Sequence, residues 1–282
     1  MDGIIVLNKE KGCTSRDVVN FVSKELGTKK VGHAGTLDPL ATGVLVLAIN
    51  QGTKIIEFLA YDEKEYIAEV KCGVLTDTLD ITGKTLERQT NYILDQEKVV
   101  QVLDSFKGKY MQEVPKYSAV KVKGKRLYEY ARKQEEVLLP KKEVEIKEIE
   151  LLDLRDDGFT FKTKVSKGTY IRSLIRDVGE KLKILCTMRN LKRTKEGIFD
   201  LEHAYTIEDI KNNKYQILSL KEALSNYRQI EVDEPLYLKI KNGNKIEDQW
   251  HVKDLCIFLY QNQVIGIYRK EKDDLRAKKV FH

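Results

Sequence analysis

The chain has 282 residues, of which 41% are hydrophobic and 33% charged, and a net charge of +6. This composition predicts a soluble globular protein with one large domain, alone or beside a small second one. No apolar run reaches the ~18 residues that a membrane-spanning helix requires, and the N-terminus does not resemble a signal peptide. The four cysteines lie far apart and form no CxxC pair. We therefore expect reduced thiols in a cytoplasm, without a disulfide framework or a zinc site.

Positive charge is concentrated in one segment of the chain. Residues 107–142 contain eleven Lys/Arg and four Glu, a local net charge of +7, so the remainder is close to neutral. Such a concentration suits a polyanion such as nucleic acid. From charge alone, a solvated lysine-rich face is an equally good interpretation. Smaller basic clusters occur at 189–195 and 269–279.

The N-terminal part predicts a strand, a helix, a loop and a second strand. Gly3 to Asn8 is apolar enough for a short buried strand. Thr14 or Ser15 is a plausible N-cap for a helix that carries one apolar stripe and ends at Gly27. The run 44–50 is apolar on both faces, which predicts a strand in the centre of a sheet.

The loop between these elements, Gly32 to Gly43, contains three glycines and an Asp-Pro pair. Glycine lets the backbone turn tightly or approach a ligand closely. Pro39 disfavours the helical conformation at Asp38, so a single carboxylate is presented on an extended loop. Taken alone, such an Asp-Pro pair is more often a solvated turn.

The middle of the chain predicts strands and helices without a regular βαβ repeat. Apolar periodicity and turn residues indicate a strand at 64–72, a polar loop at 76–83, a helix around 99–106, a turn at 123–124, a short helix near 128–134, and a hairpin of strands 144–154 and 159–165. This mixture of antiparallel hairpins and helices favours the α+β class.

The last third predicts a helix followed by a small β-rich domain. An apolar stripe from Ile171 to Leu182 marks the helix. Short helices are expected at 207–210 and 220–224, a linker at 225–233, and short strands at 236–240, 255–260 and 264–268.

Common cofactor and hydrolase motifs do not occur in this sequence. It contains no GxxxxGK[ST], GxGxxG, GxSxG or HExxH string, and its four histidines lack metal-ligand spacing. We therefore expect no metal and no organic cofactor, and any chemistry to rest on ordinary side chains. Nucleophilic catalysis by a carboxylate needs nothing more.

Five motifs occur in a fixed order along the chain. They are Lys9-x-x-Gly12-x-Thr14-Ser15, the Gly32–Gly43 string GHAGTLDPLATG, Lys64-Glu65-Tyr66, Pro115-x-Tyr117-Ser118-Ala119-x-Lys121 and KGTYIRSL from Lys167 to Leu174. Together they resemble the bacterial tRNA pseudouridine synthase B family. The resemblance is dense over residues from about 3 to 230, and the remaining C-terminal residues resemble the family only loosely. Departures from the family pattern are Glu10, Val114 and the segment 183–186, and none of them carries the proposed chemistry.

The resemblance implies a fold and two domains. The fold is a mixed, largely antiparallel sheet flanked by helices. Residues 1–228 would form the catalytic domain, with a basic RNA-gripping loop at about 109–137. Residues 229–282 would form a small PUA-like RNA-binding domain.

The resemblance also implies an activity and its central residues. The family isomerises uridine-55 in the T loop of tRNA without a cofactor. Asp38 matches the nucleophile, which attacks either the ribose C1′ or the base C6. Tyr66 matches the tyrosine that stacks on the flipped uracil and is a candidate for the later proton removal. Arg172 matches the arginine that pairs with the catalytic carboxylate.

Other residues match positions that contact substrate or RNA. Those implied for substrate binding are His33, Tyr170 and Leu191. Those implied for RNA binding are Lys9, Lys64, Lys121, Lys123, Lys125, Arg126, Arg132 and Arg193. A uridine inside the T loop must be flipped out before it can react, which costs free energy. Contacts between basic side chains and the RNA phosphates would offset this cost.

Two alternatives remain open at this stage. The chain could act on other RNA, like guide-directed relatives that use protein partners, although its short tail favours a stand-alone enzyme. It could also be a non-catalytic RNA-binding or tRNA-folding module. The expected partner is the T stem-loop of tRNA, with no membrane, no obligatory protein partner and a monomeric state.

Overall fold

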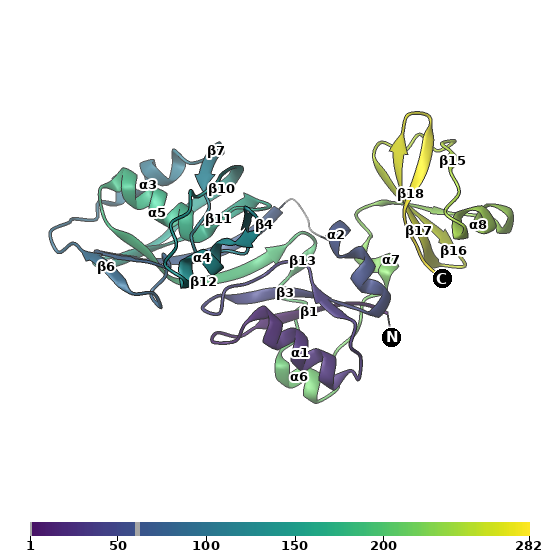
Figure 1. Cartoon of the computed structure of the whole chain (residues 1–282), viewed down its shortest axis with the longest axis horizontal. Coiled ribbons are helices and arrows are strands. Elements are labelled where there is room, and N and C mark those ends of the chain that lie inside the picture. Colours follow the sequence, from purple (N-terminus) through teal and green to yellow (C-terminus); the bar gives the residue numbers. More distant parts are fainter. Residues whose placement is uncertain (1, 60–62) are drawn as a thin grey trace.

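The computed structural model describes residues 2–59 and 63–282, which form two large β-sheets, two small hairpins and several helices (Figure 1). The first sheet has nine strands, in the order β1 (Gly3–Lys9), β3 (Thr42–Ile49), β12 (Cys186–Glu196), β4 (Glu63–Cys72), β11 (Gly158–Ser166), β10 (Lys141–Arg155) and β7 (Gly108–Glu113), with β2 (Val31–His33) beside β3 and β13 (Phe199–Asp200) beside β12. Its pairs are antiparallel except β12 with β3, so the expected mixed, largely antiparallel sheet is confirmed. None of the helices described here is long and apolar enough to span a membrane.

Helices pack on this sheet through a single hydrophobic cluster. Its members come from α1 (Ser15–Glu25), α3 (Gln96–Asp104), α5 (Ile171–Leu182) and α6 (Ile207–Lys211) as well as from the strands. The shorter helices are η1 (Asn50–Ile55), α2 (Ile56–Leu59), α4 (Leu127–Arg132) and α7 (Leu220–Ala223). Thr14 caps α1 and exchanges hydrogen bonds with Asp17 in a capping box, which confirms the predicted helix start.

Strand β12 joins the two halves of the sheet, and the sequence patterns did not predict it. It pairs with β4 along its length, but with β3 only at two positions, Lys192 beside Thr42 and Arg193 beside Gly43. Gly43 has φ +102°, and a Cβ there would lie 2.2 Å from the carbonyl oxygen of Arg193. Only glycine therefore lets β3 and β12 come together at this point.

The second sheet comprises β14 (Arg228–Glu231), β16 (Leu255–Tyr260), β17 (Gln263–Glu271), β18 (Asp274–Val280) and β15 (Ile246–Glu247), in that order. Two predictions in this region are wrong. The linker expected at 225–233 contains β14, and the strand expected at 236–240 belongs to helix α8 (Glu234–Lys241). Asp233 caps α8 by accepting from Leu236 N–H at 3.1 Å, and Pro235 occupies the first turn, where proline is tolerated.

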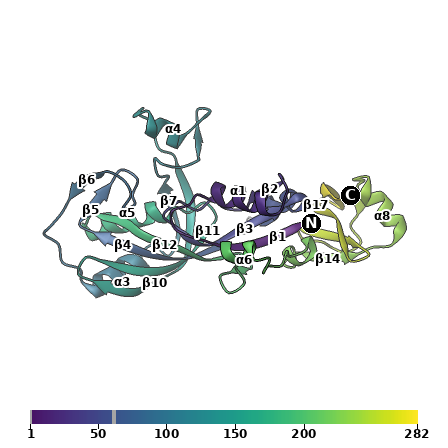
Figure 2. The same cartoon turned by 90° about the horizontal axis from the view of Figure 1, so that it is seen from below.

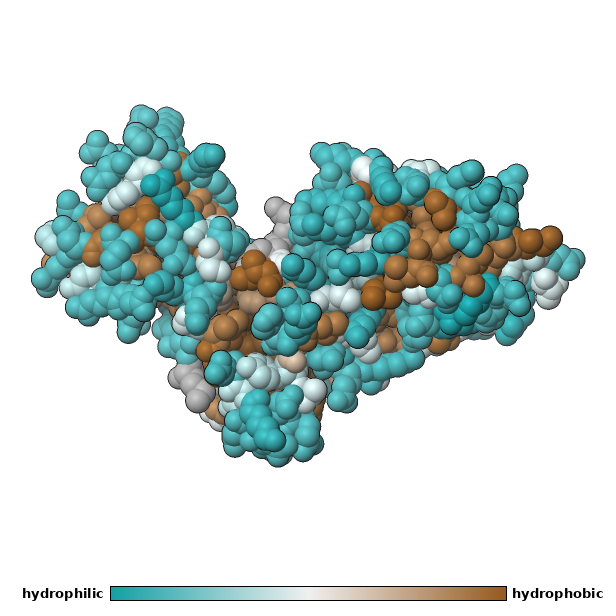
Figure 3. Space-filling model, turned by 180° about the vertical axis from the view of Figure 1, so that it is seen from behind, coloured by the Kyte–Doolittle hydropathy of each residue, from teal (hydrophilic) through white to brown (hydrophobic). Residues whose placement is uncertain are grey.

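The β-rich tail shares a core with the first sheet. One hydrophobic cluster combines Ile4 and Val46 of the first sheet with Ile257 and Ile267 of the second. From the reverse side, apolar residues are visible at the junction between the tail and the rest of the molecule (Figure 3). This shared packing ties the second sheet to the edge formed by β1 and β3.

Part of the basic segment stands out from the body of the molecule. Strand β7 occupies its beginning and pairs with β10, so residues 109–113 belong to the sheet rather than to the expected loop. Residues 114–140 carry the hairpin β8 (Lys121–Val122) and β9 (Lys125–Arg126) and helix α4, and they project from the sheet (Figure 2). We call residues 114–140 the arm. A second small hairpin, β5 (Val74–Thr76) and β6 (Thr85–Arg88), extends from the end of β4.

Candidate active site

A cavity of about 540 Å³ lies where the glycine-rich loop, β4, β12, the arm and the start of α5 meet. Its lining includes seven of the residues predicted for the site, namely Asp38, Lys64, Tyr66, Arg126, Tyr170, Arg172 and Leu191. The remaining lining residues are Thr36, Leu37, Tyr117, Ser118, Ala119, Tyr128, Gly168, Thr169 and Ile171. Segments up to 155 positions apart in sequence therefore form one cavity of the size typical of a ligand site.

Asp38 and Arg172 form a two-point ion pair at this cavity. Arg172 Nε lies 2.9 Å from Asp38 Oδ2, and an Arg172 terminal nitrogen donates to Asp38 Oδ1 at 3.2 Å. The other guanidinium donors bind the carbonyl oxygens of Thr78 at 2.9 Å and Tyr117 at 3.0 Å. Because the guanidinium is planar and held on three sides, it fixes the orientation of the carboxylate.

The environment of Asp38 sets two effects against each other. Burial in the cavity raises the pKa of the Asp38 carboxyl, the Arg172 guanidinium opposes this rise, and the Asp80 carboxylate adds to it. The polar loop predicted at 76–83 contains Asp80, but this residue is buried, with 6% exposure. Asp80 accepts hydrogen bonds from Thr78 and Thr82. No spacing pattern signals this burial, which depends on the turn at Leu79, where φ is +63°.

Buried side chains hold the loop that carries Asp38. The hydroxyl of Ser15 accepts from Leu37 N–H at 2.9 Å and lies 3.1 Å from Leu37 O. Lys9 Nζ donates to Cys13 O at 2.7 Å and to Pro39 O at 3.4 Å. Lys9 is 1% exposed, and burial lowers the pKa of its ammonium group. The prediction that Lys9 binds RNA is therefore wrong, because its charge is spent on carbonyl groups inside the protein.

Apolar and aromatic side chains form the walls of the cavity. Tyr66 and Leu191 are each 7% exposed and lie on neighbouring strands of the sheet. Burial raises the pKa of the half-buried Tyr170 hydroxyl. Gln112 holds the backbone of Tyr170 at two points, accepting from its N–H at 2.8 Å and donating to its carbonyl at 3.2 Å. Strand β7 thereby fixes the start of α5, which carries Arg172.

Arg193 is buried inside the protein and is not accessible to RNA. Its side chain has no exposed surface, and its guanidinium donates to Val44 O at 2.8 Å and Gly35 O at 3.0 Å. Of this basic cluster on β12, Lys192 and Lys195 are exposed, and a register irregularity separates Arg193 from Lys195. The prediction that Arg193 binds RNA is therefore wrong, because its guanidinium is buried and bound to carbonyl groups inside the protein.

His33 lies on β2, outside the set of cavity-lining residues. Its Nδ1 is buried and has no hydrogen-bond partner among residues 2–59 and 63–282. Burial and the nearby Arg16 lower the pKa of the imidazole, so the ring is neutral at pH 7.

The arm presents exposed cations beside aromatic rings. The five arm residues predicted to bind RNA, Lys121, Lys123, Lys125, Arg126 and Arg132, are all exposed. The guanidinium groups of Arg126 and Arg132 lie 5.8 and 5.4 Å from the ring centre of Tyr128, and Lys125 Nζ lies 5.6 Å from that of Tyr130. Of these five cations, only Arg126 lines the cavity.

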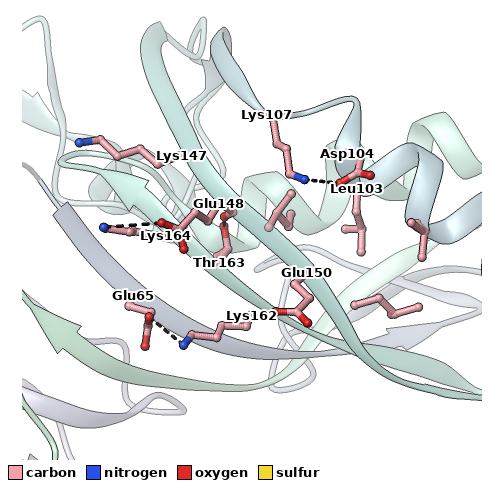
Figure 4. Close-up of a pocket in the computed structure, with 13 residues that line it drawn as sticks. Glu65, Leu103, Asp104, Lys107, Lys147, Glu148, Glu150, Lys162, Thr163 and Lys164 are labelled. Carbon is pink, nitrogen blue, oxygen red and sulfur yellow. Dashed lines mark hydrogen bonds and ion pairs between the residues drawn. The ribbon is translucent and has the colours of Figure 1, made fainter.

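A larger cavity, of about 650 Å³, lies between α3, β10, β11 and β4 (Figure 4). Its charges are largely paired with one another: Lys107 with Asp104 at 2.6 Å, Lys162 with Glu65 at 2.9 Å, and Lys164 with Glu148 at 3.7 Å. It contains none of the predicted site residues. Within the described ranges, no three His, Cys, Asp or Glu side chains are grouped closely enough to hold a metal ion.

Comparisons with known proteins agree with this geometry. Residues 23–171 match the family model "TruB family pseudouridylate synthase (N terminal domain)", and residues 172–228 match "tRNA pseudouridylate synthase B C-terminal domain". A protein named tRNA pseudouridine synthase B from Clostridium tetani is 42% identical over 274 residues, which are 96% of this chain and 93% of that protein. One of the same name from Caldanaerobacter subterraneus subsp. tengcongensis is 42% identical over 284 residues, 100% of this chain and 99% of its own.

Solved structures show the same fold at lower sequence identity. A chain of "a Cbf5-Nop10-Gar1 Complex" superposes with a TM-score of 0.76 at 24% identity, covering 99% of this chain and 85% of the other. A chain of an "H/ACA RNP bound to a substrate RNA containing 2'-deoxyuridine" has a TM-score of 0.75 at 22% identity, with the same coverage. The two family models and the relatives at 42% identity show that this chain belongs to the TruB family of pseudouridylate synthases.

Proposed function

We propose that this chain converts uridine-55 in the T loop of tRNA to pseudouridine, with Asp38 as the nucleophile and without a cofactor. The observation that carries the proposal is the two-point Asp38–Arg172 ion pair in a cavity walled by Tyr66 and Leu191. The relatives named tRNA pseudouridine synthase B supply the substrate class. In this proposal the chain acts as a monomer, and its tail contacts RNA as a PUA-like domain.

The cavity suits a flipped nucleotide. Taking a base out of a folded loop costs a few kcal/mol, and stacking on an aromatic ring returns about 1–3 kcal/mol. Tyr66 offers such a ring, and because it is only 7% exposed, little water would compete with a base for contact with it. Arg126 lines the cavity and the other arm cations are exposed, so the arm can bind the phosphate groups that flank the flipped base.

Asp38 can act as a nucleophile in this environment because the Arg172 guanidinium opposes the rise in its pKa that burial causes, and holds the carboxylate at the cavity. Attack at the ribose C1′ and attack at the base C6 are both compatible with a carboxylate at this position. In either route the N1–C1′ bond breaks and a C5–C1′ bond forms. The C5 proton leaves and N1 gains one, so the reaction is an isomerisation. Tyr66 is the side chain we assign to the removal of the C5 proton.

The decisive experiment uses a T stem-loop transcript that carries tritium at C5 of uridine-55. The wild-type chain should release tritium to water, because C5 loses its hydrogen when it forms the new bond to the ribose C1′. A transcript with cytidine at position 55 and the label at other uridines should release none. Binding of the first transcript without any release of tritium would contradict the proposal and favour a tRNA-folding module instead.

Replacing Lys121, Lys123, Lys125 and Arg126 together by Ala should weaken RNA binding and flatten its salt dependence. Each phosphate contact contributes about −0.7 to −0.9 to the slope of log K against log salt concentration. If all four contact phosphates, the slope should become about 3 less negative. Filter binding between low and moderate salt measures this slope. The matched control replaces Lys24, Lys98, Lys211 and Lys214, which are exposed and lie outside the arm, the tail and the cavity. An unchanged slope in the arm variant would show that the arm does not contact RNA phosphates.

A further inference from the structure

We propose that Glu196, acting through Arg193 and Lys64, is a positioning residue that sets the place of the loop bearing Asp38. We call these three residues the buried ion cluster. The inference rests on the proposed role of Asp38 as the nucleophile. It concerns residues that do not themselves form the Asp38–Arg172 pair.

The three side chains of the buried ion cluster form a continuous chain of charges. Glu196 Oε2 lies 3.1 Å from an Arg193 terminal nitrogen, and Glu196 Oε1 lies 2.9 Å from Lys64 Nζ. Arg193 and Glu196 have no exposed surface, and Lys64 is 16% exposed and lines the candidate active site. Buried charges are costly unless an opposite charge lies close by, and Glu196 supplies the negative charge that pairs with both cations.

The buried ion cluster touches the loop directly. Arg193 donates to Gly35 O at 3.0 Å, three residues before Asp38, and to Val44 O at 2.8 Å on β3 after the loop. A Cβ on Gly35 would lie 2.6 Å from Glu196 Oε1 and 2.8 Å from Lys64 Nζ. The loop backbone therefore packs directly against the charged ends of the cluster. A change in the cluster alters the contacts that hold the loop at Gly35.

This contact completes a series of anchors around Asp38. Ser15 holds Leu37, and Lys9 holds Pro39, so the residues on both sides of Asp38 are fixed from helix α1 and the segment before it. Arg193 adds an anchor from β12, the strand that joins the two halves of the sheet. The buried ion cluster thus connects the loop to the half of the sheet that carries Tyr66. Its proposed role is to set the position of Asp38 relative to that ring.

The test is Glu196→Gln, which keeps the shape of the side chain but removes its charge. In single-turnover tritium release at saturating T stem-loop RNA, the rate should fall about tenfold to hundredfold, because small displacements of a reacting group have effects of that size. The dissociation constant for RNA should change less than about threefold. Glu196→Asp, which restores the charge on a shorter side chain, should recover part of the rate.

Asp248→Asn is the matched control, since Asp248 also has a fully buried side chain paired with a lysine, Lys270, but lies in the tail. Both variants should lose thermal stability, and only Glu196→Gln should lose rate. Equal rates for the two folded variants would overturn the proposal.

Gly35→Ala tests the same contact with all charges in place, and it decides the question if Glu196→Gln fails to fold. A Gly35→Ala enzyme with the wild-type rate would also overturn the proposal.

The Asp38→Asn variant distinguishes a failure of the proposed nucleophile from a failure of the positioning role of Glu196. If Asp38→Asn retains turnover, the proposed nucleophile is wrong. If Asp38→Asn is inactive while Glu196→Gln keeps the wild-type rate, only the positioning role fails.

Discussion

Asp38→Asn should reduce pseudouridine formation by about 10⁴-fold or more while leaving the affinity for T stem-loop RNA within about threefold of wild type. The amide has nearly the same shape as the carboxylate, so one oxygen still accepts from Arg172 and the loop keeps its anchors. It is not a nucleophile, so no covalent step can begin. Tritium release measures turnover, and filter binding measures affinity.

The control for this variant is Asp153→Asn, an exposed carboxylate on β10 paired with Arg155. It should behave as wild type in both assays. Turnover by Asp38→Asn at the wild-type rate would show that another group attacks the substrate. A large loss of RNA affinity would show that the carboxylate serves binding rather than chemistry.

The dependence of the wild-type rate on pH should report the same carboxyl group. Burial raises the pKa of Asp38 in the folded protein, and the nucleophile must be ionised. Activity should therefore be present above this raised pKa and be lost as the pH falls through it. The loss should begin at a higher pH than an ordinary aspartate would give.

Arg172→Lys should lower the single-turnover rate about 10²- to 10³-fold although it conserves the charge. A lysine ammonium cannot form the two-point contact with Asp38 while also donating to the carbonyl groups of Thr78 and Tyr117. Asp38 would keep a nearby cation but lose its fixed orientation, and the contact between the arm and the cavity would weaken.

Arg176→Lys provides a closely matched control on the same helix. Arg176 lies one turn after Arg172 and pairs with Glu113 and Asp177, but it does not line the candidate active site. Its replacement should change the rate less than about threefold. Similar losses in both variants would mean that the effect arises from the stability of α5 and not from the Asp38–Arg172 geometry.

The residues nearest the proposed chemistry could be predicted because their motifs are local in sequence. The string around Asp38, the Lys64-Glu65-Tyr66 triplet and the start of α5 each carry their own pattern, and the structure brings all three to one cavity. Their roles in catalysis remain a prediction. The prediction of Lys9 and Arg193 as RNA contacts failed, since a basic residue in a motif looks the same in sequence whether it is exposed or buried.

The sequence by itself determined the α+β class, the start of α1, the hairpin between β10 and β11, and the family to which the chain belongs. These follow from capping residues, alternation, turn chemistry and motif order, which act over a few positions. The tertiary structure alone decided that β12 joins the two halves of the sheet and that Asp80 is buried beside Asp38. It also decided that Glu196 links Arg193 to Lys64 beside the loop that carries Asp38. The physical reason is that burial and ion pairing depend on which distant strands meet, and no short stretch of sequence contains that information.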